Sequence, residues 1–217
     1  MDRTSVLDST RNHVRAALKR DFSGHDWWHT HRVVRTALAI AGEEGADPYI
    51  VELAALLHDL ADWKFSGGDE TAGPRAAREW LEGLGADPET VVRVCEIVGG
   101  VSFKGAGVPT PMATREGECV QDADRLDALG AIGIARAFAY GAIKGSPLHD
   151  PDSEPRLHGS FQEYRSAAGG TTAHFHEKLF LLKDRMNTAA GRRIAEERHS
   201  YMEGYLARFL AELDGEA

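Results

Sequence analysis

The seven residues from Leu56 to Asp62 combine side chains that can hold a metal ion with one that can move a proton. His58 and Asp59 are adjacent, at the end of an apolar, helix-forming run. A neutral imidazole and a carboxylate are both ligand types for divalent cations. Asp62 follows His58 by one helical turn, so the two side chains share a face, and this carboxylate could handle protons for a water molecule that the metal activates. This stretch therefore predicts part of a metal centre.

A second stretch, from His25 to Val33, contains three histidines in seven residues. Any one of them alone is more typical of a capping or surface residue than of a metal ligand. His29 is the best ligand candidate, because it shares a helical stripe with Val33 and Ile40, which we expect to face the core. Asp26 is placed to cap the helix that carries it.

A third stretch, from Gln121 to Gly130, places three carboxylates in an otherwise small and apolar helix. Asp124 and Asp127 are three residues apart and so share a face. The flanking Leu126 and Leu129 are typical of a core, which argues against a fully solvated helix face. A carboxylate on a buried helix needs a partner, and a cation is a good one.

The rest of the chain is read as helices that bring these stretches together. Gly-Ala-Asp-Pro occurs at residues 45–48 and 85–88, and each copy predicts a helix end, an N-cap and a new helix. The other predicted helices span about 5–19, 28–44, 74–84, 118–140, 172–186 and 188–213. No segment shows the β-branched alternation of a sheet. We expect an all-α fold with one domain over residues 1–217 and a metal site between helices.

Composition sets limits on function. The net charge of −9 argues against non-specific nucleic-acid binding, although it leaves room for a small phosphorylated substrate. The two cysteines are too few for a disulfide framework, which fits a reducing cytoplasm. The first residues lack the apolar core of a signal peptide, and no apolar run has the roughly 18–20 residues of a membrane span. We therefore expect a cytoplasmic protein that makes no membrane contact, of undetermined oligomeric state.

Taken together, the three stretches resemble the HD-domain superfamily of metal-dependent phosphohydrolases, in particular a bacterial subfamily of small, stand-alone members. The resemblance runs from about residue 25 to residue 209. It is carried by these motifs: His-Asp-Trp-x-His-x-x-Arg-Val, Leu-His-Asp-Leu-Ala-Asp-Trp-Lys-Phe, Gly-Val-Ser-Phe-Lys-Gly, Gln-Asp-Ala-Asp-Arg-Leu-Asp-Ala and Phe-His-Glu-Lys-Leu. The family pattern of ligands matches His29, His58, Asp59 and Asp124.

The resemblance also implies an activity. The related enzymes hydrolyse nucleotides, and some are manganese-dependent nucleoside triphosphate pyrophosphohydrolases. The alarmone hydrolases of the superfamily carry a glutamate where this chain has Asp62 and an acid where it has Trp63, which argues against direct transfer of their mechanism. A ligand set of two histidines and two aspartates suits Mn²⁺, which we favour, with Fe²⁺, Ni²⁺, Zn²⁺ and Mg²⁺ as alternatives.

Further residues are assigned roles around this centre. Asp62 or Asp127 would take or relay a proton. Four side chains are candidates to hold substrate phosphate: His25, Lys64, Lys104 and Lys178, with Lys183 and Arg185 as weaker ones. For Lys64 and Lys104 a role as plain solvent-exposed lysines is at least equally compatible with the sequence. The segment from 144 to 170 is either a lid over the site or a disordered surface segment.

Two other functions remain open from the sequence. The first is a phosphodiesterase for a cyclic or oligonucleotide signal. The second is a metal-stabilised helical module that binds a nucleotide or a protein and catalyses nothing. The filled ligand positions argue against the binding module, and an assay with and without chelator separates the classes.

Overall fold

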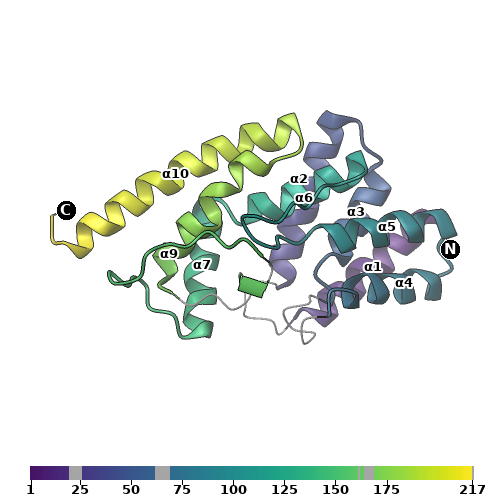
Figure 1. Ribbon diagram of the computed structural model, residues 1–217. Helices are drawn as coiled ribbons and strands as arrows, with labels where there is room; N and C mark the ends of the chain where they lie inside the picture. The colour runs from purple at the N-terminus through teal and green to yellow at the C-terminus, as the bar shows by residue number, and fades with distance from the viewer. Residues whose placement is uncertain (20–25, 62–68, 161, 164–168, 217) are drawn as a thin grey trace. The chain divides into compact units, whose positions relative to one another are not determined.

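The structure is a computed structural model that describes residues 1–19, 26–61, 69–160, 162–163 and 169–216. Within these ranges it is helical and contains no strand, which confirms the predicted all-α class (Figure 1). The chain divides into two compact units: residues 1–103 with 110–124, and residues 104–109 with 125–217. They are called unit 1 and unit 2 below. The expectation of a single domain stays a prediction.

Unit 1 is built around α3 (Pro48–Leu57), which packs against α1 (Arg3–Ala17), α2 (Trp27–Glu44) and α5 (Pro88–Gly100). A further helix of unit 1, α4 (Ala72–Gly83), packs against α5. Eight of the ten residues of α3 are buried, so this helix is apolar around most of its circumference and forms the centre of the unit. Because α3 is buried so extensively, the positions of His58 and Asp59, which follow Leu57, are fixed as well.

Both Gly-Ala-Asp-Pro copies act as predicted. The Asp47 carboxylate accepts a hydrogen bond from the Tyr49 amide at the start of α3, and the Asp87 carboxylate accepts one from the Thr90 amide at the start of α5. In each helix the proline occupies the first turn, where the missing N–H has no helical partner to lose. The beginning of α3 is therefore fixed by local sequence, and its end by burial.

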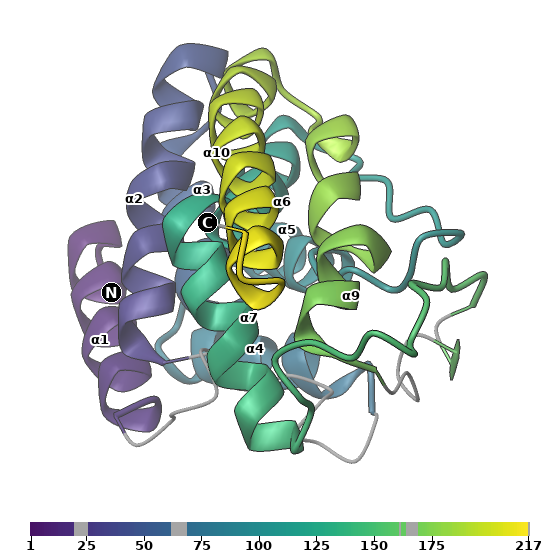
Figure 2. The ribbon, with the colours of Figure 1, turned by 90° about the vertical axis from the view of Figure 1, so that its left-hand side faces the viewer.

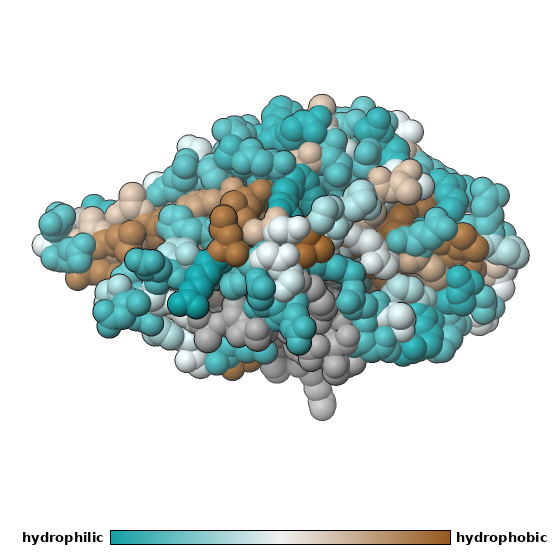
Figure 3. Space-filling view, viewed as in Figure 1, coloured by the Kyte–Doolittle hydropathy of each residue, from teal (hydrophilic) through white to brown (hydrophobic). Residues whose placement is uncertain are grey.

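Unit 2 contains α7 (Gly130–Lys144), α9 (Thr171–Glu177), two 3₁₀ turns and α10 (Ala189–Leu213). α7 packs against both α9 and α10, as Figure 2 shows. Aromatic rings fill the space between these helices: Phe175 is fully buried and stacks on Tyr205, with Phe138 beside it. In the space-filling view hydrophobic residues follow α10 toward its C-terminal end, where Leu213 is exposed (Figure 3).

Two predicted helices differ from the structure. The segment predicted as one helix over 118–140 is two helices, α6 (Arg115–Asp127) and α7, bent by 68° at the break. The segment predicted as a helix over 172–186 is the short α9 followed by the 3₁₀ turns η1 (Leu179–Leu181) and η2 (Lys183–Arg185). Among the described residues no single helix is long and apolar enough to span a membrane, although the bent pair passes that test by length and composition alone.

The break between α6 and α7 has a backbone cause. Gly130 adopts a φ of 71°, in the left-handed region that other residues enter at a cost. Three residues on, the backbone carbonyl of Ala128 lies so close to Gly133 that an added Cβ would meet its oxygen at 2.2 Å. The corner therefore needs glycine at both positions, a requirement that helical periodicity does not reveal.

We expect Gly133→Ala to lower the free energy of unfolding by about 1–3 kcal/mol, because the new methyl group overlaps a backbone atom that no rotamer change can move. Chemical denaturation followed by circular dichroism measures the change. Gly204→Ala in α10 is the matched control, since a Cβ there meets nothing within 4 Å. The control should gain roughly 0.5–1 kcal/mol from helix propensity. An equal gain in both variants would contradict this account of the corner.

Candidate metal centre

The four predicted ligands lie in unit 1 and come from three segments. His29 is in the first turn of α2, His58 and Asp59 directly follow α3, and Asp124 is in α6. The side chains of His29, His58 and Asp59 are almost completely buried, whereas that of Asp124 is 27% exposed. Asp124 is therefore the side chain through which the cluster is accessible to solvent.

The N-cap of α2 positions His29. The Asp26 carboxylate accepts a hydrogen bond of 2.8 Å from the His29 amide, which fixes the start of the helix one turn before the core. Val33 and Ile40 continue the stripe and are buried, as predicted. The imidazole of His29 consequently enters the interior with the apolar face of its helix.

The backbone of α3 orients His58. Its Nδ1 lies 2.8 Å from the carbonyl oxygen of Ala55, so an Nδ1–H donates to that oxygen and Nε2 faces the cluster. A histidine ligand is commonly fixed in this way, with one ring nitrogen held by an outer partner and the other left for the metal. The sequence gives no signal for this partner, because the acceptor is a backbone atom.

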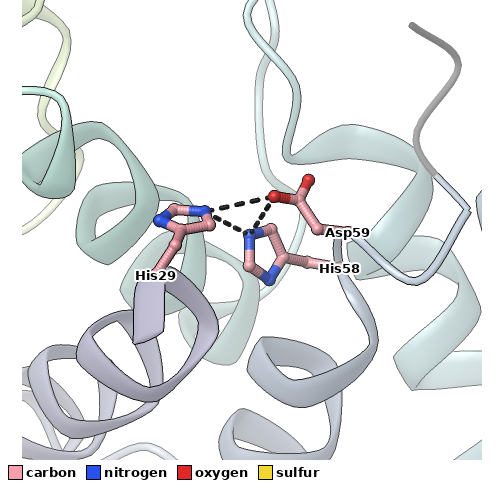
Figure 4. A group of neighbouring side chains, drawn as sticks. All are labelled: His29, His58 and Asp59. Carbon is pink, nitrogen blue, oxygen red and sulfur yellow. Dashed lines mark hydrogen bonds and ion pairs between the residues drawn. The ribbon is translucent and has the colours of Figure 1, made fainter. Parts of the chain in front are cut away.

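The ligand atoms converge on one point (Figure 4). The Nε2 atoms of His29 and His58 are 3.2 Å apart, and the Asp59 Oδ2 lies 3.1 Å from the first and 3.4 Å from the second. The Asp124 Oδ1 lies 3.5 Å and 3.8 Å from the same two nitrogens. Ligands that share one ion at ~2.0–2.2 Å are separated by roughly 3–3.5 Å. The donors of His29, His58 and Asp59 therefore fit a single divalent cation, and the carboxylate of Asp124 lies beside the two imidazoles.

The two carboxylates control the protonation of His58. Burial lowers the pKa of the His58 imidazole, but Asp59, Asp124 and the Ala55 carbonyl outweigh burial and raise this pKa to about 9. At neutral pH the metal-free cluster therefore keeps a proton on His58 that offsets part of the carboxylate charge. A cation must displace that proton before Nε2 can bind it.

The structure does not describe three of the residues assigned to the site. His25, Asp62 and Lys64 lie outside the described ranges, so their roles remain predictions. Lys104 and Lys178 belong to unit 2, and their assignment to phosphate is likewise untested.

Asp127 has a partner that sequence reasoning missed. Its Oδ2 is 2.9 Å from an Nη1 of Arg136, and both side chains are largely buried. The two residues are nine positions apart in a segment predicted as one helix, where they would lie on different turns. The bend between α6 and α7 makes the ion pair geometrically feasible. A proton-relay role for Asp127 stays a prediction beside this structural one.

We expect binding of Mn²⁺ to metal-stripped protein at pH 7 to release about one proton, because His58 is protonated below its pKa of about 9. The apparent affinity should rise by up to tenfold per pH unit and level off near pH 9. Titration calorimetry in buffers of different ionisation enthalpy measures the proton count.

The stabilisation that His58 gives the metal-free fold has the opposite trend: it is complete below the ordinary pKa of 6.5 and is lost as pH rises through about 9.

The control for this experiment is His199→Gln, which changes a buried histidine of α10 outside the cluster. This variant should release the same number of protons as the unmodified protein. Binding heats that do not depend on the buffer would show that His58 is already neutral, and would contradict the prediction.

Comparison with known proteins places this cluster in a family. The family model of the HD domain matches residues 27–129. The uncharacterized protein YpgQ of Bacillus subtilis (strain 168) is 39% identical over 217 residues, which cover 99% of this chain and 97% of YpgQ. A crystal structure of YpgQ in complex with ADP matches with a TM-score of 0.75 and 37% identity, over 97% of this chain and 100% of that one.

Two further crystal structures are similar over nearly the whole length. A protein from Lactobacillus plantarum has a TM-score of 0.87 at 32% identity and covers 99% of this chain and 100% of its own. An HD-superfamily hydrolase from Bacillus thuringiensis has a TM-score of 0.74 at 40% identity, over 98% and 99% of the two chains. With its buried His and Asp cluster, the chain belongs to the HD-domain superfamily of metal-dependent phosphohydrolases.

Proposed function

We propose that this protein hydrolyses nucleotides, and that it acts as a nucleoside triphosphate pyrophosphohydrolase or on a closely related phosphoanhydride bond. The observation that carries the proposal is the convergence of His29, His58 and Asp59 around one point, with the partly exposed carboxylate of Asp124 beside the two imidazoles. The ADP complex of YpgQ supports a nucleotide as the ligand class, because that protein is similar over nearly all of this chain.

The four side chains would hold the metal ion, for which we favour Mn²⁺. When bound, such an ion lowers the pKa of water and polarises a phosphoryl oxygen. Four protein ligands leave positions for water and for substrate when the coordination number is five or six. Fe²⁺, Ni²⁺, Zn²⁺ and Mg²⁺ are the alternatives to test.

Burial and orientation are what the rest of the chain contributes. The almost complete burial of three ligands excludes bulk water from their side of the site, which strengthens their electrostatic interactions. The Ala55 carbonyl keeps the Nδ1 proton of His58, so that Nε2 remains the ligand atom. Asp62, one turn beyond His58 in the sequence, is our proposed proton acceptor, and Lys64, Lys104, Lys178 and His25 are the proposed phosphate contacts.

The proposal includes a cytoplasmic location. Cys95 and Cys119 are both free thiols and both buried. Burial raises the pKa of the Cys119 thiol to about 12, which keeps it protonated and unreactive. Two buried, protonated thiols are compatible with a reducing compartment, where no disulfide is needed for stability.

We expect Asp124→Asn to lower kcat/KM for nucleotide hydrolysis at least about 100-fold, because it removes a charged ligand and retains the side-chain shape. Release of phosphate and pyrophosphate from a nucleotide panel is measured with metal-stripped protein and each metal added back. The product identifies the bond that is broken. Chelator should abolish the activity.

The matched control is Glu118→Gln, a change of the same kind in α6 at a carboxylate of similar exposure that pairs with Arg115. Its metal affinity should remain that of the unmodified protein. If no nucleotide is hydrolysed while metal is demonstrably bound, the nucleotide-hydrolase proposal is wrong. Turnover of a cyclic or oligonucleotide substrate alone would then favour a phosphodiesterase, and no turnover would favour a binding module.

A further inference from the structure

The position of Asp124 depends on α6, which is not one of the helices that hold the other predicted ligands. His58 and Asp59 directly follow the buried α3, and His29 lies in the first turn of α2, which packs against α3. The Asp124 carboxylate lies beside the two imidazoles only while α6 keeps its place in unit 1. The contacts that hold α6 therefore decide whether Asp124 can act as a ligand.

Gln121 is a side chain of α6 that ties this helix to other parts of unit 1. It is fully buried, and its Nε2 donates to the carbonyl oxygen of Gly100 at 2.9 Å and to that of Thr110 at 3.0 Å. Because both partners are acceptors, the side-chain atom that faces them is the amide nitrogen, which has two N–H groups to donate. Gly100 is the last residue of α5, where backbone carbonyls lack partners within their own helix. One amide group therefore joins α6 to the end of α5 and to the segment that precedes α6.

Gln121 shares one face of α6 with Gly117 and Asp124. The three positions follow the i, i+4, i+7 spacing, so they lie on successive turns of the same face. A Cβ added at Gly117 would lie 3.1 Å from the Sδ of Met112 and 3.4 Å from the Cγ1 of Ile97 in α5, so this face of α6 packs closely. Gln121 occupies the turn between that close contact and the metal ligand. Its two hydrogen bonds consequently fix the turn of α6 that directly precedes Asp124.

The loss of these two hydrogen bonds should displace α6. A buried carbonyl that is left without a donor is costly, so the helix would move until water can reach the oxygens of Gly100 and Thr110. A metal ion tolerates little displacement of its ligands, since ligand distances vary by only about 0.2 Å. A small shift of α6 is therefore sufficient to weaken the bond between Asp124 and an ion.

We propose that Gln121 is a positioning residue of the metal centre, which joins α6 to the end of α5 and thereby places the Asp124 carboxylate as the fourth ligand of the ion. The inference rests on the proposed function, since it concerns the metal ion of that site. Gln121 itself binds neither metal nor substrate in this scheme. It acts through Asp124, and its effect should appear in the affinity for the metal ion.

The test compares Gln121→Met with Thr10→Val in metal-stripped protein. Methionine is about as long as glutamine but donates no hydrogen bond. Thr10 is equally buried and donates to the Val6 carbonyl at 2.8 Å, in α1, which carries none of the four predicted ligands. Titration calorimetry measures the binding of Mn²⁺. We expect Gln121→Met to weaken this binding about tenfold, as is common when an outer partner of a metal site is removed. Thr10→Val should leave it unchanged, although both substitutions should lower the thermal midpoint.

Two further variants separate positioning from a general loss of structure. Gln121→Asn keeps the amide on a shorter side chain, so it should lose less affinity than Gln121→Met, and it carries the test if the methionine variant does not fold. In an Asp124→Asn background, Gln121→Met should cause little further loss, because the carboxylate through which it acts is already gone. Both backgrounds are compared with Zn²⁺, which nitrogen and oxygen ligands bind more tightly than Mn²⁺.

Three results would overturn the inference: unchanged Mn²⁺ affinity in the Gln121 variants, an equal loss in Thr10→Val, or a full further loss in the Asp124→Asn background. Its failure is distinguishable from failure of the proposed function. If the unmodified protein binds Mn²⁺ but hydrolyses no nucleotide, the proposed function fails and the binding data still decide on Gln121. If nucleotides are hydrolysed while the Gln121 variants bind Mn²⁺ normally, only the inference on Gln121 is wrong.

Discussion

Electrostatic repulsion between the groups of the His and Asp cluster is the constraint on which the rest of unit 1 depends. The Nε2 atoms of His29 and His58 lie 3.1–3.8 Å from carboxylate oxygens of Asp59 and Asp124, and three of these four side chains are almost completely buried. When Nε2 of His58 carries no proton, its lone pair faces these carboxylate oxygens, and the repulsion is strong in a buried site. Two species relieve the repulsion: a proton on His58 in the metal-free protein, or a divalent cation. Folding must supply the ligand positions in either state.

The helix ends supply those positions. Asp26 fixes the first turn of α2 before His29, and Asp47 with Pro48 fixes the first turn of α3 ten residues before His58. Burial of α3 then fixes its far end, where the ligands follow directly. The two caps are interactions between residues close in sequence. Together with the burial of α3 they determine where the Nε2 atoms of His29 and His58 meet. Asp124, the fourth predicted ligand, lies in α6 and has the most exposed side chain of the four.

Much of this was accessible from sequence, for identifiable reasons. The caps at Asp26 and Asp47 follow from residue type and spacing, and the burial of His29 follows from the stripe that it shares with Val33. The corner was missed because it depends on a positive φ at Gly130 and on a close backbone approach at Gly133, and helical periodicity encodes neither. The Ala55 acceptor and the Arg136 partner of Asp127 were missed for a related reason: both arise from geometry that exists only once the helices have formed.

The burial of α3 has a consequence for how unit 1 fluctuates. Amide groups in a helix packed on nearly all sides exchange with solvent only through large openings of the fold, whereas exposed helices fray at low cost. His58 and Asp59 directly follow the helix that opens last. Local unfolding of α1 or α4 would therefore leave His58 and Asp59 in place, so that two of the four proposed protein ligands would stay ready to bind a metal ion again after it dissociates.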